Sequence, residues 1–401
     1  MRKPNIPLDE KSAEAHLINF LSIEGVTGQE KAIAAAVSAA LKKVGVPASA
    51  IRFDDVRTRI PVPTQTGNLI VELSGTRRGD RLLFSTHLDT VALCAGARPK
   101  RKGGRIINEN ASSALGGDAR TGVAVIVAMV ETLLKQKLPH PPLTLLFTVR
   151  EESGLHGARE LDARELKGAT MCFNVDANHA NQLVVGAVGQ ENWEVEIAGR
   201  ASHAGIAPDA GISATLVGSI ALAEAHRGGW FGKVKKRDGN GTSNPGYFGG
   251  RDGRSAGEAN NVVTDFVRIT GEARSADARF VSKISAAYRD AFRKAQAEVR
   301  NVAGKTADVR FDVKPAYPPF KLDEKSPAVK YAVRAVESLG LKPNVGTSNG
   351  GLDANWLVGR HGVPTVTFGS GQAEVHTVNE YVDMSEFLQG CRLAVRLATQ
   401  E

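Results

Sequence analysis

Hydrophobic residues in the first half of the chain follow two different spacings. Residues 69–73, 82–86, 143–149 and 171–175 are short apolar runs of strand length, whereas residues 122–138 repeat apolar positions at helical spacing. Strands separated by helices need crossover connections, which place helices on the faces of the sheet. We therefore predict an α/β domain with a largely parallel or mixed sheet that is covered by helices on both faces.

The middle of the chain predicts a second, smaller domain. Its expected elements alternate strand, helix, strand, helix, strand, at residues 193–197, 212–226, 266–272, 282–299 and 309–313. This order over about 120 residues is typical of a small α+β unit. Residues 239–257, which are rich in Gly, Ser and Asn, predict a long loop around a short strand.

The α/β pattern resumes after Pro315. The elements expected there are a helix, a strand and a further helix, at residues 327–339, 365–368 and 385–398. The α+β domain is therefore expected to be an insertion. We predict that it comprises residues 190–315 and that residues 1–189 and 316–401 together form the α/β domain.

The composition of the 401-residue chain is that of a globular protein, with 42% hydrophobic and 23% charged residues. These proportions exclude a disordered chain, a fibre and a disulfide-stapled miniprotein. The three cysteines are far apart and odd in number, which favours free thiols in a reducing compartment. Because no apolar leader opens the chain and no apolar stretch approaches the ~18 residues that span a bilayer, we expect a cytoplasmic protein with no membrane partner.

The formal charge of +8 is concentrated in two short clusters. Their nine cations, without an acid between them, are Arg98, Lys100, Arg101, Lys102 and Arg105, and Lys233, Lys235, Lys236 and Arg237. Neither cluster contains the aromatic residues on which single-stranded nucleic acids stack, so we expect no nucleic-acid partner. Two solvated loops are the ordinary interpretation. The alternative hypothesis is that the cluster at 98–105 attracts anionic peptides to a cleft near His87.

Candidate chemistry follows the predicted strands at their carboxyl ends. The residues found there are His87 and Asp89, Glu151 and Glu152, Asp176, and Glu374 with His376. Asp118 lies just before helix 122–138, where the positive end of the helix dipole favours an anion. Ligands of open α/β sheets bind beyond the carboxyl ends of the strands. Because a purely structural sheet gains nothing from burying so many acids, these residues predict a metal site.

Imidazole nitrogens combined with carboxylate oxygens suit zinc. Several carboxylates around one ion would leave unbalanced negative charge, so two metal ions bridged by a carboxylate fit better. Asp89 is expected on the same face as His87, where its carboxylate accepts from the other ring nitrogen. Glu151 and Glu152 point opposite ways in an extended segment, so one can bind metal while the other takes a proton from water.

These residues resemble the motifs of the di-zinc exopeptidase superfamily, which contains peptidase T, glutamate carboxypeptidase, aminoacylase and succinyl-diaminopimelate desuccinylase. The segments that carry the resemblance are Ser85-Thr86-His87-Leu88-Asp89-Thr90-Val91, Leu115-Gly116-Gly117-Asp118, Glu151-Glu152-Ser153-Gly154-Leu155-His156-Gly157-Ala158 and His376-Thr377. They occur in order over nearly the whole chain, and the likeness is greatest to the peptidase T-like branch. The resemblance implies a catalytic domain at 1–189 and 316–401 and a lid or dimerisation domain at 190–315.

The resemblance also implies two zinc ions, with Co²⁺ or Mn²⁺ as alternatives. The implied ligands are His87, Asp118 and Asp176 for one ion and Asp118, Glu152 and His376 for the other. Asp118 would bridge the ions, Glu151 would be the general base on the bridging water, and Asp89 would orient His87. Where this family often has a second acid and a lysine, this chain has Ala119 and Arg120.

Further residues take their expected roles from the resemblance alone. His203 matches a lid histidine that stabilises the tetrahedral oxyanion and that in some members reaches across a dimer. Asn261 and Arg274 match lid residues that contact the substrate carboxylate, and Gly350 with Gly351 matches a glycine-rich loop that lines the site. A homodimer through the lid domain is therefore an expectation.

The chain is accordingly expected to be a metal-dependent hydrolase that cleaves a peptide bond in small peptides, most closely a peptidase T-like aminopeptidase. A carboxypeptidase or an N-acyl-amino-acid deacylase of the same superfamily is the alternative. A non-catalytic binding relative would tend to lose the base or a ligand, and this chain retains all of them.

Overall fold

The computed structural model describes residues 6–401, which divide into two compact units. The larger unit, which the resemblance implies to be the catalytic unit, comprises the chain up to Ala187 and Phe320–Glu401, and the inserted unit comprises Val188–Pro319. These breaks lie slightly outside the expected 190–315. The first and the last strand of the inserted unit along the chain extend further than their apolar cores indicate, to Gly189 at one end and Tyr317 at the other.

The catalytic unit contains a mixed sheet that has nine strands among the described residues. The strand order is β1 (Ile51–Phe53), β2 (Leu69–Leu73), β6 (Leu143–Thr148), β3 (Leu82–His87), β7 (Met171–Val175), β16 (Thr365–Phe368), β8 (Gln182–Ala187) and β14 (Phe320–Lys321), with β15 (Asn344–Ser348) also beside β8. Strands β6, β3, β7 and β16 are parallel, whereas β1, β2, β8 and β14 pair antiparallel to their neighbours in this order. The four parallel strands end at the same edge.

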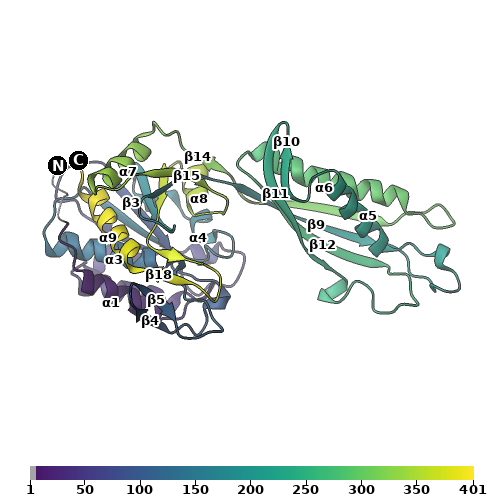
Figure 1. Ribbon diagram of the computed structural model, residues 1–401, viewed down its shortest axis with the longest axis horizontal. Helices are drawn as coiled ribbons and strands as arrows, with labels where there is room; N and C mark the ends of the chain where they lie inside the picture. Colours follow the sequence, from purple (N-terminus) through teal and green to yellow (C-terminus); the bar gives the residue numbers. More distant parts are fainter. Residues whose placement is uncertain (1–5) are drawn as a thin grey trace. The chain divides into compact units, whose positions relative to one another are not determined.

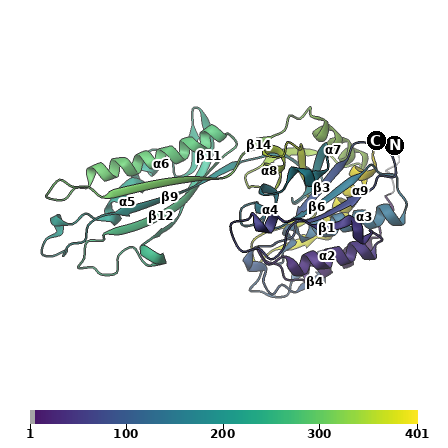
Figure 2. The ribbon, with the colours of Figure 1, turned by 180° about the vertical axis from the view of Figure 1, so that it is seen from behind.

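Helices cover both faces of this sheet, as predicted (Figures 1 and 2). Phe84, Phe147 and Phe173 pack on one face against α1 (Glu10–Leu21), α2 (Lys31–Lys43), α3 (Gly117–Lys135), α7 (Pro327–Ser338) and α9 (Met384–Thr399). Leu83 and Leu146 point to the other face, towards α8 (Ala354–Gly359) and the segment after α4 (His156–Arg159). Alternate residues of one strand thus reach different cores, which is why these strands are continuous apolar runs.

The inserted unit is an antiparallel sheet with two helices on one face (Figure 1). Its strand order is β10 (Gly232–Lys236), β11 (Gly239–Gly249), β12 (Phe266–Ser275), β9 (Gly189–Ala198) and β13 (Asp308–Tyr317), and its helices are α5 (Ala214–Arg227) and α6 (Ala278–Glu298). Buried Trp193 stacks on Tyr288 and Phe311 in the core between the sheet and α6.

The long loop around a short strand that was expected at 239–257 is wrong in its proportions, because Gly239–Gly249 is an 11-residue strand paired on both sides. Its glycines do not mark a loop. A Cβ on Gly239 would lie 2.3 Å from the ring of Phe280, so the missing side chain lets α6 pack closely on the strand. Cross-strand pairing and helix packing, rather than local propensity, determine this strand.

The two basic clusters are also not simple loops. The first forms a hairpin of β4 (Pro99–Lys102) and β5 (Arg105–Asn108), which joins β17 (Gln372–Ala373) and β18 (Tyr381–Asp383) in a small sheet, and the second lies largely on β10. Lys100 pairs with Glu109 at 2.5 Å, and the guanidinium of Arg105 lies 3.9 Å from the centroid of the Tyr381 ring. Attraction of anionic peptides by this hairpin remains a hypothesis.

Helix α3 approaches the carboxyl ends of β3 and β7 at Gly122. A Cβ built there would lie 2.3 Å from both the Thr86 hydroxyl oxygen and the Val175 carbonyl oxygen. The helix ends at Lys135, three residues before the predicted end, because Lys137 is left-handed and the Leu138 N–H donates to the Leu133 carbonyl.

None of the helices within residues 6–401 is long and apolar enough to cross a membrane.

We predict that Gly122→Ala lowers the free energy of unfolding by about 1–3 kcal/mol, because the added methyl group meets a backbone oxygen that cannot move aside. Urea denaturation measures this change. The matched control is Gly346→Ala, whose Cβ would meet no atom within 4 Å and should change stability by less than about 0.5 kcal/mol. Equal stability of the two variants would contradict the prediction.

Candidate metal centre

Parallel pairing brings the predicted site residues to one edge of the sheet. His87 is the last residue of β3 and lies opposite Thr148, the last residue of β6. Glu151 and Glu152 follow three and four residues later, and Asp176 follows directly on β7. All of these strands are buried, so the side chains at their ends sit in a largely water-excluded environment.

The first donor set is built around His87. Its Nε2 lies 3.1 Å from Asp118 Oδ1 and 3.8 Å from Asp176 Oδ1. Helix α3 presents Asp118 from an irregular first turn, in which Asp118 itself has non-helical backbone angles. One imidazole nitrogen and two carboxylate oxygens therefore converge.

The second donor set is built around His376, which lies in the connection from β17 to β18. Its Nε2 lies 3.0 Å from Glu152 Oε1 and 3.4 Å from Asp118 Oδ2. The two carboxylate oxygens of Asp118 thus face two different imidazoles. The structure brings all five expected metal ligands together, and single donor atoms of His87, Asp118 and Glu152 lie within 4.8 Å of one another.

The carboxylates at this edge stabilise positive charge at both histidines. Contacts with Asp118 and Glu152 raise the pKa of His376 to about 10. The pKa of His87 is raised well above its usual range, because the charge of Glu151 and contacts with Asp118 outweigh burial. Burial tends to raise the pKa of Asp118, but contacts with His376 and His87 lower it overall. A nitrogen and oxygen donor set that favours cationic charge fits divalent zinc.

Glu151 and Glu152 have different surroundings although they are neighbours. Glu152 contacts His376. Glu151 is buried, and its carboxylate has no imidazole at hydrogen-bond distance among the described residues. Burial, together with the charges of Asp176 and Glu152, raises the pKa of Glu151 well above its usual value. A carboxylate with a raised pKa is suited to accept a proton near neutral pH.

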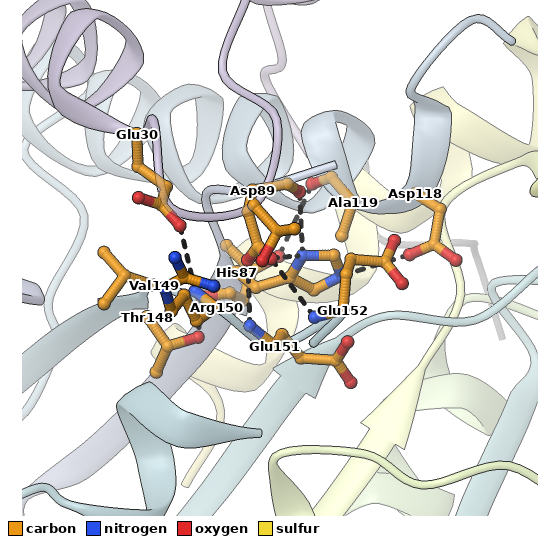
Figure 3. Close-up of polar contacts among 12 residues, drawn as sticks. Glu30, His87, Asp89, Asp118, Ala119, Thr148, Val149, Arg150, Glu151 and Glu152 are labelled. Carbon is orange, nitrogen blue, oxygen red and sulfur yellow. Dashed lines mark hydrogen bonds and ion pairs between the residues drawn. The ribbon is translucent and has the colours of Figure 1, made fainter. Parts of the chain in front are cut away.

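Asp89 contacts His87 mainly through its backbone. Nδ1 of His87 lies 3.0 Å from the Asp89 carbonyl oxygen and 3.5 Å from its carboxylate (Figure 3). The carboxylate oxygens instead accept from the backbone N–H groups of Glu151 and Glu152 at 3.0 and 3.1 Å. Asp89 thus connects the histidine with the glutamate segment, a wider role than the expected contact with the ring.

Two residues that hold the ligands, Glu380 and Gln372, were not among the predicted site residues. The buried Glu380 carboxylate accepts from the backbone N–H groups of Leu115, Gly116 and Asp118 at 2.8, 2.7 and 3.2 Å. Gln372 donates to Asp176 at 3.2 Å. The only available signal for Glu380 was an acid four residues after His376, which is weak without knowledge of the contacts.

The expected substrate residues are divided between the units. In the inserted unit, the Ala204 N–H donates to the Asn261 carbonyl, so the segments of His203 and Asn261 are paired. The guanidinium of Arg274 is paired with both carboxylate oxygens of Glu272, at 2.9 and 2.8 Å.

Gly350 and Gly351 lie between β15 and α8 in the catalytic unit. The substrate and oxyanion roles of these residues, in both units, remain predictions.

Comparisons with known proteins agree with this geometry. Residues 83–400 match the model of peptidase family M20/M25/M40. An uncharacterised Bacillus subtilis protein, YqjE, is 30% identical over 391 residues, which cover 97% of this chain and 98% of that protein.

Two solved structures are also similar over most of their length. The aminopeptidase PepT of Bacillus cereus has a TM-score of 0.83 and 29% identity, and a tripeptidase of Staphylococcus aureus has a TM-score of 0.87 and 26% identity. Each alignment covers 98% of both chains. The predicted fold and the predicted peptidase class are thereby confirmed, and the chain belongs to peptidase family M20/M25/M40, within its peptidase T-like branch.

Proposed function

We propose that the chain is a di-zinc aminopeptidase that removes the N-terminal residue of small peptides such as tripeptides. The observation that carries the proposal is the position of Asp118, whose two oxygens face His87 and His376. This arrangement supports one metal ion on each side of a shared carboxylate, as in other two-metal hydrolases. The similarity to an aminopeptidase and a tripeptidase supports the substrate class.

The two ligand sets would hold zinc through His87, Asp118 and Asp176 and through Asp118, Glu152 and His376. When bound, zinc supplies Lewis acidity towards the scissile carbonyl and lowers the pKa of water. Glu151 accepts the proton of the attacking water and returns it to the leaving amine. Asp89 and Glu380 hold the backbone of the segments that carry the glutamates and Asp118. His203 of the inserted unit is the candidate donor to the oxyanion.

A substrate panel tests the proposed reaction. The zinc-loaded and cobalt-loaded chain should hydrolyse tripeptides with a free amino terminus and should release the N-terminal residue, as followed by mass spectrometry. N-blocked peptides and acyl amino acids should be at least tenfold poorer substrates. Release of the C-terminal residue from N-blocked peptides would indicate a carboxypeptidase instead, and hydrolysis of acyl amino acids would indicate a deacylase.

Glu151→Gln should lower kcat by about 10²–10⁴-fold while zinc binding stays unchanged, because the amide cannot take the proton from water. Steady-state kinetics and calorimetric zinc titration measure the two effects separately. Glu109→Gln removes an exposed acid on the segment before Asp118 and serves as the matched control with unchanged kcat. Unchanged turnover of Glu151→Gln would exclude the assigned base.

The apparent zinc affinity of the metal-free chain should rise with pH. The pKa of His376 is raised to about 10, so its imidazolium must lose a proton before the ring can bind metal at neutral pH. Each displaced proton should change the affinity by about tenfold per pH unit between pH 6 and 8. Calorimetry at three pH values measures the slope of the logarithm of the zinc affinity against pH. His376→Gln should reduce this slope by about one. A pH-independent affinity would contradict this prediction.

A further inference from the structure

Two buried carboxylates hold the segment that carries both functional glutamates. Three consecutive backbone N–H groups donate to them: Arg150 to Glu30 Oε1 at 3.1 Å, Glu151 to Asp89 Oδ1 at 3.0 Å and Glu152 to Asp89 Oδ2 at 3.1 Å (Figure 3). Asp89 is one of the site residues that the sequence predicts. Glu30 lies 120 residues before Arg150 and belongs to none of the motifs that predicted the site.

The contact of Glu30 falls on the residue whose backbone is strained. Arg150 has φ of +54°, a left-handed conformation that is uncommon for residues other than glycine. Such a conformation persists only where its surroundings over-determine it. The side chain of Arg150 supplies part of that constraint, through Thr64 Oγ1 at 2.7 Å and Ser153 Oγ at 3.2 Å. Glu30 supplies the acceptor for its backbone N–H.

Helix capping does not account for Glu30. It occupies the N-cap position of α2, but its side chain makes no capping hydrogen bond to that helix. The side chain is fully buried, and Oε1 also accepts from the Gly28 N–H at 2.7 Å. Among the described residues no group donates to Oε2. A buried acceptor without a donor destabilises the fold, and a serine or threonine cap would avoid this cost.

A buried cation, Arg120, interacts with both carboxylates. Arg120 is 1% exposed and interacts electrostatically with Asp89 and Glu30, and its Nη2 donates to the Gly25 carbonyl at 3.3 Å. The single guanidinium therefore offsets part of the negative charge of the two acids. Charged acceptors form stronger hydrogen bonds to backbone N–H groups than neutral ones.

We propose that Glu30 is a positioning residue that fixes Arg150 in its left-handed conformation and thereby sets the positions of Glu151 and Glu152. The consequence for catalysis rests on the proposed function, in which these residues are the general base and a metal ligand. Without the acceptor, the N–H of Arg150 is left without a partner and the segment relaxes. The base is then misplaced relative to the water, which affects kcat more than KM.

Backbone hydrogen exchange of the full-length chain tests the structural claim without relying on activity. Glu30→Leu removes the acceptor at similar side-chain length, whereas Glu30→Gln keeps an oxygen at the place of Oε1. We expect at least tenfold faster exchange in Glu30→Leu for the peptide that spans residues 150–152, in the metal-free and the zinc-loaded chain. Glu30→Gln should exchange like the wild type. Equal exchange in Glu30→Leu and the wild type would overturn the proposal.

Kinetics of the same variants test the consequence. Glu30→Leu should lower kcat by about tenfold to a hundredfold with KM within about twofold, and Glu30→Gln should restore most of kcat. Glu24→Leu is the matched control, because Glu24 is an exposed acid of the same segment whose carboxylate contacts Gly96. A folded Glu30→Leu variant with wild-type kcat would overturn the proposal.

A further variant keeps the proposal testable if Glu30→Leu does not fold. Glu30→Asp retains the charge but withdraws the carboxylate by one methylene group, so it should be less active than Glu30→Gln and should exchange faster at 150–152. Activity and exchange of Glu30→Asp equal to or better than those of Glu30→Gln would overturn the proposal. A wild-type chain without peptidase activity would contradict the proposed function alone, since the exchange results would still decide the role of Glu30.

Discussion

Carboxylate charge is concentrated at one edge of a buried sheet, and the arrangement of the surrounding segments serves to hold it there. Asp118, Glu151, Glu152 and Asp176 converge there with only two imidazoles from the expected ligand set. Charge of this density in a water-excluded place requires cations or protons. The same carboxylates raise the pKa values of His87 and His376, because they stabilise the protonated imidazoles. The five ligand side chains are held where metal ions would supply that charge.

Backbone hydrogen bonds to further buried acids hold these ligands in place. Glu380 accepts from the segment of Asp118, and Asp89 and Glu30 accept from the segment of the two glutamates. The close approach of α3 at Gly122 brings Asp118 to the end of β3. The acids of the site thus have two roles. Some are candidate metal ligands, and others accept hydrogen bonds from the backbone of the segments that carry those ligands. This use of acids explains why the site contains more of them than two metal ions need.

The sequence predicts the catalytic unit well because its signals are local. Continuous apolar runs such as those ending at His87 and Thr148 indicate buried parallel strands, and the residues after them must meet at one edge. Glu30 and Glu380 could not be found in this way. Each contacts a segment more than a hundred residues away, and an isolated glutamate in a sequence is ordinarily a solvated side chain. Only a short strand was expected within 239–257, and the full strand Gly239–Gly249 could not be predicted, because its pairing partners and α6, rather than its own residues, determine its length. The roles of His203 and Arg274 rest on the resemblance alone. Both residues belong to the inserted unit, whereas the expected metal ligands belong to the other unit.

Anomalous diffraction at the zinc edge can show whether Asp118 is shared between two metal ions. Crystals of the zinc-loaded chain should show two peaks about 3.5–4 Å apart. One peak should lie beside His87 and Asp176, and the other beside His376 and Glu152, with Asp118 between them. A single peak, or peaks that Asp118 does not contact, would show that the chain does not hold a pair of metal ions bridged by Asp118.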